Sequence, residues 1–435
     1  MKHSLKTLIV MMALLASGLG AFAGDLLAGA AKVSITPDLD EFPWTAHGER
    51  PFNGIHDSIY ARALVLDDGA TRFALVELDL TAVPSYNGFD QSLVKGAAAA
   101  GKLTENHVII VTSHTHNTIL SFFHGGEPDA VVSRELQRVS SAVSQAVSQA
   151  AAQLVPATIA FGRGAAYVNV NNGEAKGQTN EFDPEGASSK VLDVIRVADR
   201  KGDPLALLVN YASHAEVMFR SATKDGGYEI SGDLPGAVAH LLEGSASGAP
   251  VVLTTAGAEG DQITILKSRQ LADAFPASDE GAGGWSVLNL LSRRLANAVV
   301  DVAEALPAGQ AQAQIKIASG AFTAPGQRYS PDGNGAWVKD TTASTVTIPL
   351  STVRIGDIAL AAVSADIASD IGVGIRASSP MKNTVVLSMM GASVGYVLTD
   401  AHYQHLGHAV YGSPVQGGYA EKGIPAAIAG LLRQE

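Results

Sequence analysis

Short apolar segments of strand length alternate with longer amphipathic segments through the first two thirds of the chain. Val108 to Thr112 is one of the apolar segments, and a DDG turn joins two others, YARALVLDDG and TRFALVELDL, as in a β-hairpin. Val131 to Val155 and Val287 to Leu306 repeat apolar residues at helical spacing. This alternation predicts an α/β fold with a mixed β-sheet core flanked by helices.

The chain has 435 residues, 46% of them hydrophobic, and contains no linker long enough to force separate domains. We therefore expect a single large catalytic domain over residues 24–435, with 311–346 as a candidate insertion. The formal net charge is −12, and no long basic run is present. These two features argue against nucleic acid as the main partner.

The N-terminus has the layout of a cleavable signal peptide over residues 1–23. Lys2 and Lys6 precede an apolar core at Leu8 to Leu15, and Ala21-Phe22-Ala23 fits an A-x-A cleavage pattern. An N-terminal membrane anchor is the alternative. No other run approaches the ~20 apolar residues that cross a bilayer. We therefore expect a periplasmic or secreted protein without a transmembrane span in its mature chain, at most in transient contact with a membrane surface.

Five apolar runs end in short polar or small-residue segments: VIIVTSHTH, LALLVNYASH, VVLTTAGAEGD, IALAAVSAD and VVLSMMGASVGY. If these strands are parallel neighbours, their carboxyl ends converge on one crevice. The crevice would contain His114, His116, His214, Asp261, Asp366 and Tyr396. Because the chain has no cysteine, a transition metal must be held by nitrogen and oxygen donors. This set matches what zinc accepts, so the sequence predicts a zinc site at the strand ends.

Each of these residues also has a structural interpretation. His114 and His116 point the same way on an extended segment, but a bare HxH pair and a lone His214 are often structural. Asp366 could be the N-cap of a helix over Ile367 to Ile371. Asp261 could orient a ligand histidine or close a turn. In ISGDLPG, a helix N-cap at Asp233 is by itself a sufficient explanation.

Several segments together resemble the neutral/alkaline ceramidase family, in the family's order and across most of residues 30 to 412. They are SITP, GIHDSIYARALVLDDG, ALVELDL, VTSHTHN, DPEGASSKVLDVIRV, VNYASH, ISGDLPG, GAEGDQ and GYVLTDAHY. The resemblance implies a zinc-dependent amidohydrolase domain that cleaves the amide of N-acylsphingosines, without the family's C-terminal immunoglobulin-like domain.

The resemblance also implies residue roles. His114, His214 and Tyr396 match zinc ligands of the family, and Asp366 stands where the family has a glutamate ligand. His116 matches a group beside the metal, and His408 lies near a second site tyrosine of the family. The family's G-D-x-S-P segment reads Gly260-Asp261-Gln262-Ile263-Thr264 here, without the serine.

The sequence thus predicts a zinc hydrolase that cleaves an amide C–N bond of a small-molecule or lipid substrate with metal-activated water. We expect catalytic roles for three residues. His116 would stabilise the oxyanion or move a proton to the leaving amine, Asp261 would fix the site, and His408 would act near the substrate. Two alternatives remain open: a zinc hydrolase of the same fold acting on a small polar amide or ester, and a non-catalytic binding protein with a decayed site.

Overall fold

The computed structural model describes residues 24–434 except 124, 178–181, 224–225, 245–247, 269–279, 333–336, 341 and 343–344. The predicted signal peptide, residues 1–23, lies outside the described part of the chain. Within that part, no helix combines the length and the apolar character needed to cross a bilayer.

Eight strands form the largest sheet, in the spatial order β11-β9-β8-β6-β1-β3-β4-β5. They are β1 (Leu27–Ser34), β3 (Tyr60–Asp67), β4 (Arg72–Leu78), β5 (Val108–Thr112), β6 (Val155–Ala165), β8 (Val191–Asp199), β9 (Pro204–Tyr211) and β11 (Val251–Ala256). β5 runs parallel to β4 and β11 parallel to β9, whereas the other pairs are antiparallel. β1 and β6 pair only at Leu27 and Ala28, so the sheet consists of two halves joined at one corner. The halves fold toward each other, and β11 lies against β3, β4 and β5.

A second sheet has the order β13-β16-β17-β19. Its strands are β13 (Ile315–Ala324), β16 (Val346–Ile355), β17 (Ile358–Val363) and β19 (Asn383–Leu387). β13 pairs with β16 along its whole length. Thus the first part of segment 311–346, up to Ala324, belongs to this sheet, and β14 (Arg328–Pro331) and β15 (Trp337–Asp340) form a separate hairpin.

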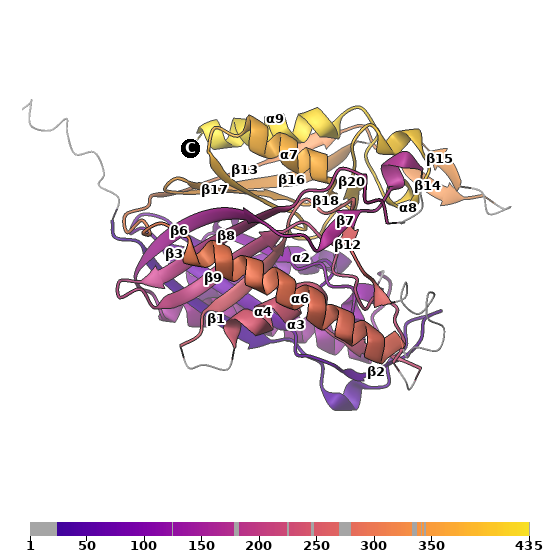
Figure 1. Ribbon diagram of the computed structural model, residues 1–435, viewed down its shortest axis with the longest axis horizontal. Helices are drawn as coiled ribbons and strands as arrows, with labels where there is room; N and C mark the ends of the chain where they lie inside the picture. The colour runs from indigo at the N-terminus through magenta and orange to yellow at the C-terminus, as the bar shows by residue number, and fades with distance from the viewer. Residues whose placement is uncertain are drawn as a thin grey trace, which may run out of the picture.

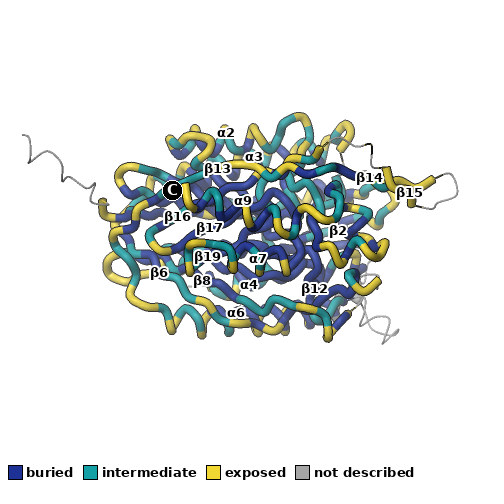
Figure 2. Tube along the Cα trace, turned by 90° about the horizontal axis from the view of Figure 1, so that it is seen from above, coloured by how far each residue is buried: buried dark blue, intermediate teal, exposed yellow. Residues whose placement is uncertain are grey.

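In the described part of the chain, six helices cover the outer faces of the two sheets, which gives four layers (Figure 1). They are α2 (Phe89–Gly101), α3 (Ala130–Ala152), α4 (Asp233–Glu243), α6 (Glu280–Glu304), α7 (Ser369–Ser378) and α9 (Ala420–Gln434). α7 and α9 pack on the four-stranded sheet, and the other four pack on the eight-stranded sheet. Between the sheets lies an apolar core that includes Leu75, Ile195, Val353 and Leu360. Buried residues accordingly fill the middle of the trace (Figure 2).

Short elements join the longer strands and helices. The strand pairs are β2 (Phe52–Ile55) with β10 (Tyr228–Ile230), β7 (Asn169–Asn171) with β12 (Gln262–Thr264), and β18 (Asp366–Ile367) with β20 (Tyr396–Val397). The single-turn helices are α8 (His408–Tyr411) and η1 (Leu39–Glu41), η2 (Tyr86–Gly88), η3 (Glu105–His107), η4 (Ile119–Phe122), η5 (Glu174–Lys176) and η6 (His402–Gln404).

The predicted fold class is confirmed, since a large mixed sheet is flanked by helices. β5 has the bounds that its apolar run predicts, and the DDG turn does join two antiparallel strands, β3 and β4. The predicted helix Val131 to Val155 ends earlier, at Ala152, because Val155 begins β6. The helical spacing of apolar residues continues past Ala152, so the sequence pattern does not reveal where α3 ends.

Candidate metal centre

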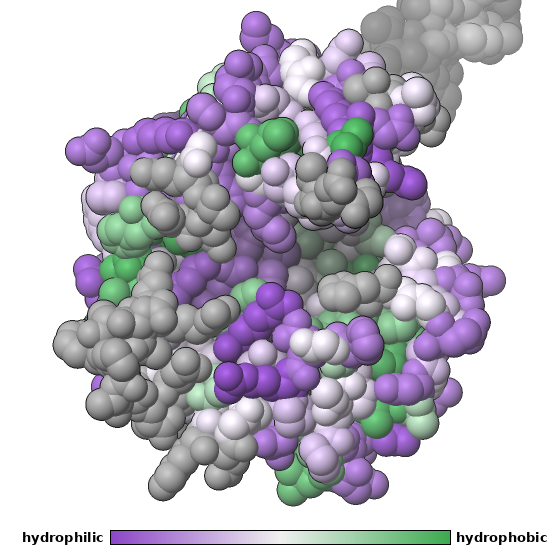
Figure 3. Space-filling view, turned by 90° about the vertical axis from the view of Figure 1, so that its right-hand side faces the viewer, coloured by the Kyte–Doolittle hydropathy of each residue, from purple (hydrophilic) through white to green (hydrophobic). Residues whose placement is uncertain are grey.

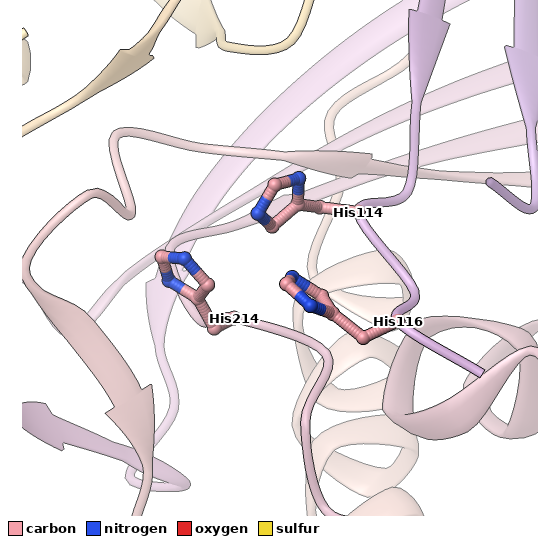
Figure 4. A group of neighbouring side chains, drawn as sticks. All are labelled: His114, His116 and His214. Atoms are coloured by element: carbon pink, nitrogen blue, oxygen red, sulfur yellow. The ribbon is translucent and has the colours of Figure 1, made fainter. Parts of the chain in front are cut away.

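His114, His116 and His214 lie together although they follow strands from different halves of the large sheet. One ring nitrogen from each lies within 4.8 Å of the others (Figure 4). The loop after β5 and the loop after β9 run side by side here, since Thr115 and Ala215 form a parallel bridge. The ends of β5 and β9 thus meet as predicted, but the condition stated for it, that all five strands are parallel neighbours, is not met because they belong to two sheets. Folding of the two half-sheets brings the loops together.

Backbone carbonyls bind the Nδ1 atoms of His114 and His214. His114 Nδ1 lies 2.8 Å from the Thr81 carbonyl, and His214 Nδ1 lies 3.0 Å from that of Glu259 and 3.1 Å from that of Gln262. A carbonyl can only accept, so each Nδ1 carries the hydrogen. In the neutral ring each Nε2 then presents its lone pair, which is the arrangement of a metal-binding histidine with its other nitrogen fixed.

Asp366 and Tyr396 reach the same place from the paired strands β18 and β20. His214 Nε2 lies 3.2 Å from Asp366 Oδ2 and 3.3 Å from the Tyr396 hydroxyl. His114 Nε2 lies 3.9 Å from the same Asp366 oxygen. The structure thus brings all four predicted ligands together, while their role as ligands remains a prediction.

The Asp366 carboxylate gives the strongest sign that a cation belongs here. Only 3% of Asp366 is exposed, and apart from His214 Nε2 at 3.2 Å neither of its oxygens has a donor. A buried carboxylate with so few donors is costly unless a cation compensates it. Two imidazole nitrogens, one carboxylate and one phenol oxygen form a donor set that zinc accepts. The residues present therefore fit the metal that the sequence predicts.

Charges in the centre act on each other strongly. Burial, together with the neighbouring His214, lowers the pKa of His114 to about 4. Burial also opposes the charged form of His214, but the Asp366 carboxylate outweighs it and raises the pKa of His214 to about 10. Burial and then Asp366 raise the pKa of Tyr396 well above its ordinary value. The Asp366 carboxylate thus draws positive charge to the Nε2 side of His214.

The interpretation of Asp366 as a helix N-cap is wrong. α7 begins at Ser369, and its N-cap is Ala368, which leaves Asp366 outside the helix. Asp261 instead binds the start of α7. Its carboxylate accepts from the Ser369 backbone N–H at 2.8 Å and from the Ser369 hydroxyl at 3.0 Å.

Asp261 does not orient a ligand histidine through its side chain, since His214 Nδ1 bonds to backbone oxygens. It fixes the segment that begins three residues after Asp366. That contact is consistent with the predicted positioning role, and the structure shows no direct contact with the histidine cluster that would make Asp261 a reacting group.

His408 is the first residue of α8 and lies next to Tyr396. It is exposed, and its ring stands edge-on to Tyr396 with centroids 5.8 Å apart. Next to it, Tyr411 stacks on Trp337 of β15 at 4.6 Å. This end of the molecule is hollowed, with hydrophilic and hydrophobic residues around the hollow (Figure 3). The predicted catalytic role of His408 would therefore concern substrate above Tyr396.

Comparison with solved structures shows the fold. A neutral ceramidase from Pseudomonas aeruginosa matches with a TM-score of 0.70 and 16% identity, covering 94% of this chain and 74% of that one. A ceramidase complexed with C2 matches with a TM-score of 0.69 and 15% identity, covering 94% and 75%. No family model and no curated protein sequence matches significantly.

This chain has the neutral ceramidase fold. At such low identity the likeness extends to the fold alone, so the chemistry of the site depends on the residues described above.

Three charged residues near the centre of this ceramidase-like fold did not stand out in the sequence. Glu216, two residues after His214, forms an ion pair with Lys267. Glu259 precedes Asp261 by two residues and is fully buried. The segments H-A-E and G-A-E-G-D contain these acids, but nothing in their spacing tells an acid that faces the site from one that faces solvent.

Asp233 joins the two histidine loops to each other. Its carboxylate accepts from Asn117 Nδ2 at 2.9 Å and from the backbone N–H groups of Val217 at 3.1 Å and Met218 at 2.9 Å. Asp233 is the first residue of α4, whose N-cap is Gly232, so the N-cap prediction is wrong by one position. The more important function of Asp233 is to set the spacing of the two loops.

We expect Asp233→Ala to lower the free energy of unfolding by about 3 kcal/mol or more, because several buried donors lose a charged acceptor. Asp233 has φ of 49°, a region in which asparagine is among the best tolerated residues. Asp233→Asn keeps one acceptor oxygen and should lose less. Urea unfolding of the three proteins measures the difference, and equal stability of Asp233→Ala and the wild type would contradict this role.

Proposed function

We propose that this chain is a zinc-dependent hydrolase that cleaves the amide bond of an N-acylated amine. The observation that carries the proposal is the meeting of two imidazole Nε2 atoms, the Tyr396 hydroxyl and the buried Asp366 carboxylate. His114, His214, Asp366 and Tyr396 would hold the metal. Zinc bound there would lower the pKa of a water molecule to near 7 and polarise a carbonyl group.

The chain's own residues would complete the reaction. His116 lies against the two histidines that we assign as ligands, with its ring centroid 4.7 Å from His114 and 5.9 Å from His214. Its Nε2 is buried and has no partner. With its hydrogen on Nδ1, the neutral imidazole can accept a proton at Nε2 from the attacking water. Once protonated, it can donate a hydrogen bond to the oxyanion and pass that proton to the departing amine.

The neutral ceramidase fold and the rings around the opening support an N-acyl lipid such as an N-acylsphingosine as the substrate. The ring centroid of Phe219 lies 4.9 Å from that of His116. Tyr411 stacks on Trp337 and follows His408, whose ring contacts Tyr396, by three residues. Such rings suit an apolar substrate chain. We further propose that the protein acts in the periplasm or outside the cell and does not bind nucleic acid.

Two measurements on the purified protein test the proposal. Metal analysis after purification without chelators should find one zinc per chain. Hydrolysis should be measured with a fluorescent N-acylsphingosine and with a short-chain, water-soluble N-acyl amide. Zinc-dependent release from the sphingolipid supports the full proposal, and cleavage of the short amide alone overturns its lipid part. Zinc without any hydrolysis would indicate a binding protein with a decayed site.

A further inference from the structure

Glu216 and Lys267 form an ion pair beside His116. Lys267 Nζ lies 2.5 Å from Glu216 Oε2, and the other oxygen, Oε1, lies 3.8 Å from His116 Nδ1. The Glu216 side chain is 10% exposed and that of Lys267 is 15% exposed. Taking two charges largely out of water costs free energy that their attraction often fails to repay. A pair in this place therefore calls for a role beyond stability.

The backbone holds both partners in place. Ser268, which follows Lys267, donates its backbone N–H to the Val217 carbonyl at 2.9 Å. Val217 in turn donates its N–H to the Asp233 carboxylate, which also binds Asn117 of the loop that carries His116. The three segments that carry Lys267, Glu216 and His116 are thus tied together.

We propose that Glu216, fixed by Lys267, is a positioning residue for His116. The Glu216 carboxylate would accept the Nδ1 hydrogen of His116 and leave Nε2 for the substrate. This inference rests on the proposed function, in which His116 acts on the reacting atoms.

The distance of 3.8 Å is too long for a hydrogen bond in the structure without substrate. Catalytic hydrogen bonds are often long before the substrate binds and tighten in its complex. A carboxylate that orients a catalytic imidazole recurs in other hydrolases, where it fixes the tautomer.

Lys267 has a second effect in this arrangement. An acidic side chain next to a metal centre competes to become a ligand itself. By occupying Oε2, the Lys267 ammonium holds Glu216 toward His116 and keeps the predicted ligand set at two imidazoles, Asp366 and Tyr396.

The test compares Glu216→Gln, Lys267→Met and Lys267→Arg with the wild type, all loaded with zinc. Lys32→Met is the matched control, because it removes a lysine from another buried glutamate, Glu243, away from the histidine cluster. The readouts are zinc content, kcat and KM for amide hydrolysis, and the ring nitrogen signals of His116 in histidine-labelled protein.

We expect Glu216→Gln and Lys267→Met to keep zinc, to lose about 10- to 100-fold in kcat, and to change KM by less than about threefold. Lys267→Arg should recover most of kcat, and Lys32→Met should match the wild type. His116 should carry its hydrogen on Nδ1 in the wild type and lose that preference in Glu216→Gln.

Two results would overturn the inference: an Nε2–H tautomer of His116 in the wild type, or unchanged kcat in Glu216→Gln with zinc retained. The tautomer requires no substrate, so it decides the role of Glu216 even if the wild type hydrolyses neither amide. Failure of the wild type to bind zinc or to hydrolyse any amide contradicts the proposed function instead.

Discussion

Replacing His214 with alanine should abolish zinc binding and hydrolysis together. His214 Nε2 lies 3.2 Å from Asp366 and 3.3 Å from the Tyr396 hydroxyl, so it occupies the middle of the predicted ligand set. Loss of a residue that merely supports a ligand lowers metal affinity by about 10- to 100-fold, and loss of the ligand itself should lower it further. Equilibrium dialysis against buffered zinc, followed by metal analysis, measures this change.

The same variant should also lose the stabilisation that zinc gives. A metal that binds only the folded state at 100 times its Kd adds about 2.7 kcal/mol, so the wild-type Tm should rise with zinc and the variant's Tm should not. His402→Ala is the matched control, because His402 is also buried, at 2% exposure, and lies outside the histidine cluster. Full zinc content in His214→Ala would remove His214 from the site.

The layer structure follows closely from the local pattern of the sequence. β5 is a run of four apolar residues and a threonine, all buried, and both its faces lie against other layers, so its composition alone reveals it. The pairing of β18 with β20 could not be predicted in this way. Each is two residues long, and 28 residues with another strand between them separate Ile367 from Tyr396. Only the packed structure decides that they meet.

The candidate site shows the same division. His114, His116 and His214 could be selected because their side chains are unusual directly after apolar strands, and the structure brings them together. Glu216 and Glu259 could not, because acids in loops are common and their direction depends on contacts from distant segments. The tertiary hydrogen bonds of Asp233 could not be predicted from the sequence for a related reason. A helix start explains an aspartate locally, but its bonds reach Asn117 and Met218 through the tertiary fold.

Most substitutions of buried residues lower the free energy of unfolding, but Glu259→Gln should raise it for the metal-free protein at neutral pH. Glu259 has no exposed surface, and neither of its carboxylate oxygens has a hydrogen-bond partner. Burial and the Asp366 carboxylate raise the pKa of Glu259 well above its ordinary value, against the opposing effect of His214. A raised pKa in the folded state means that the protein binds this proton more tightly than the unfolded chain does.

The sign of the pH dependence follows from that difference. The contribution of Glu259 to stability is fully present below the unfolded pKa, ~4.3, and is lost as pH rises through the higher pKa of the folded state. Glutamine does not titrate, so the variant should gain on the wild type as pH rises. We expect an advantage of about 1–3 kcal/mol at pH 8 and little difference at pH 4.

Urea unfolding of chelator-treated protein at both pH values measures this change, with Glu174→Gln as the control. Glu174 is also buried, but its Oε2 accepts the Ala409 backbone N–H at 2.8 Å, so the loss of its charge should destabilise the protein at pH 8. Zinc should reduce the advantage of Glu259→Gln, because a cation beside Asp366 offsets the charge of a buried carboxylate. A Glu259→Gln variant that is less stable than the wild type at pH 8 without metal would contradict this prediction. Glu259 would then have a partner that keeps its carboxylate ionised, and that partner would compensate part of the negative charge of Asp366 and Glu259.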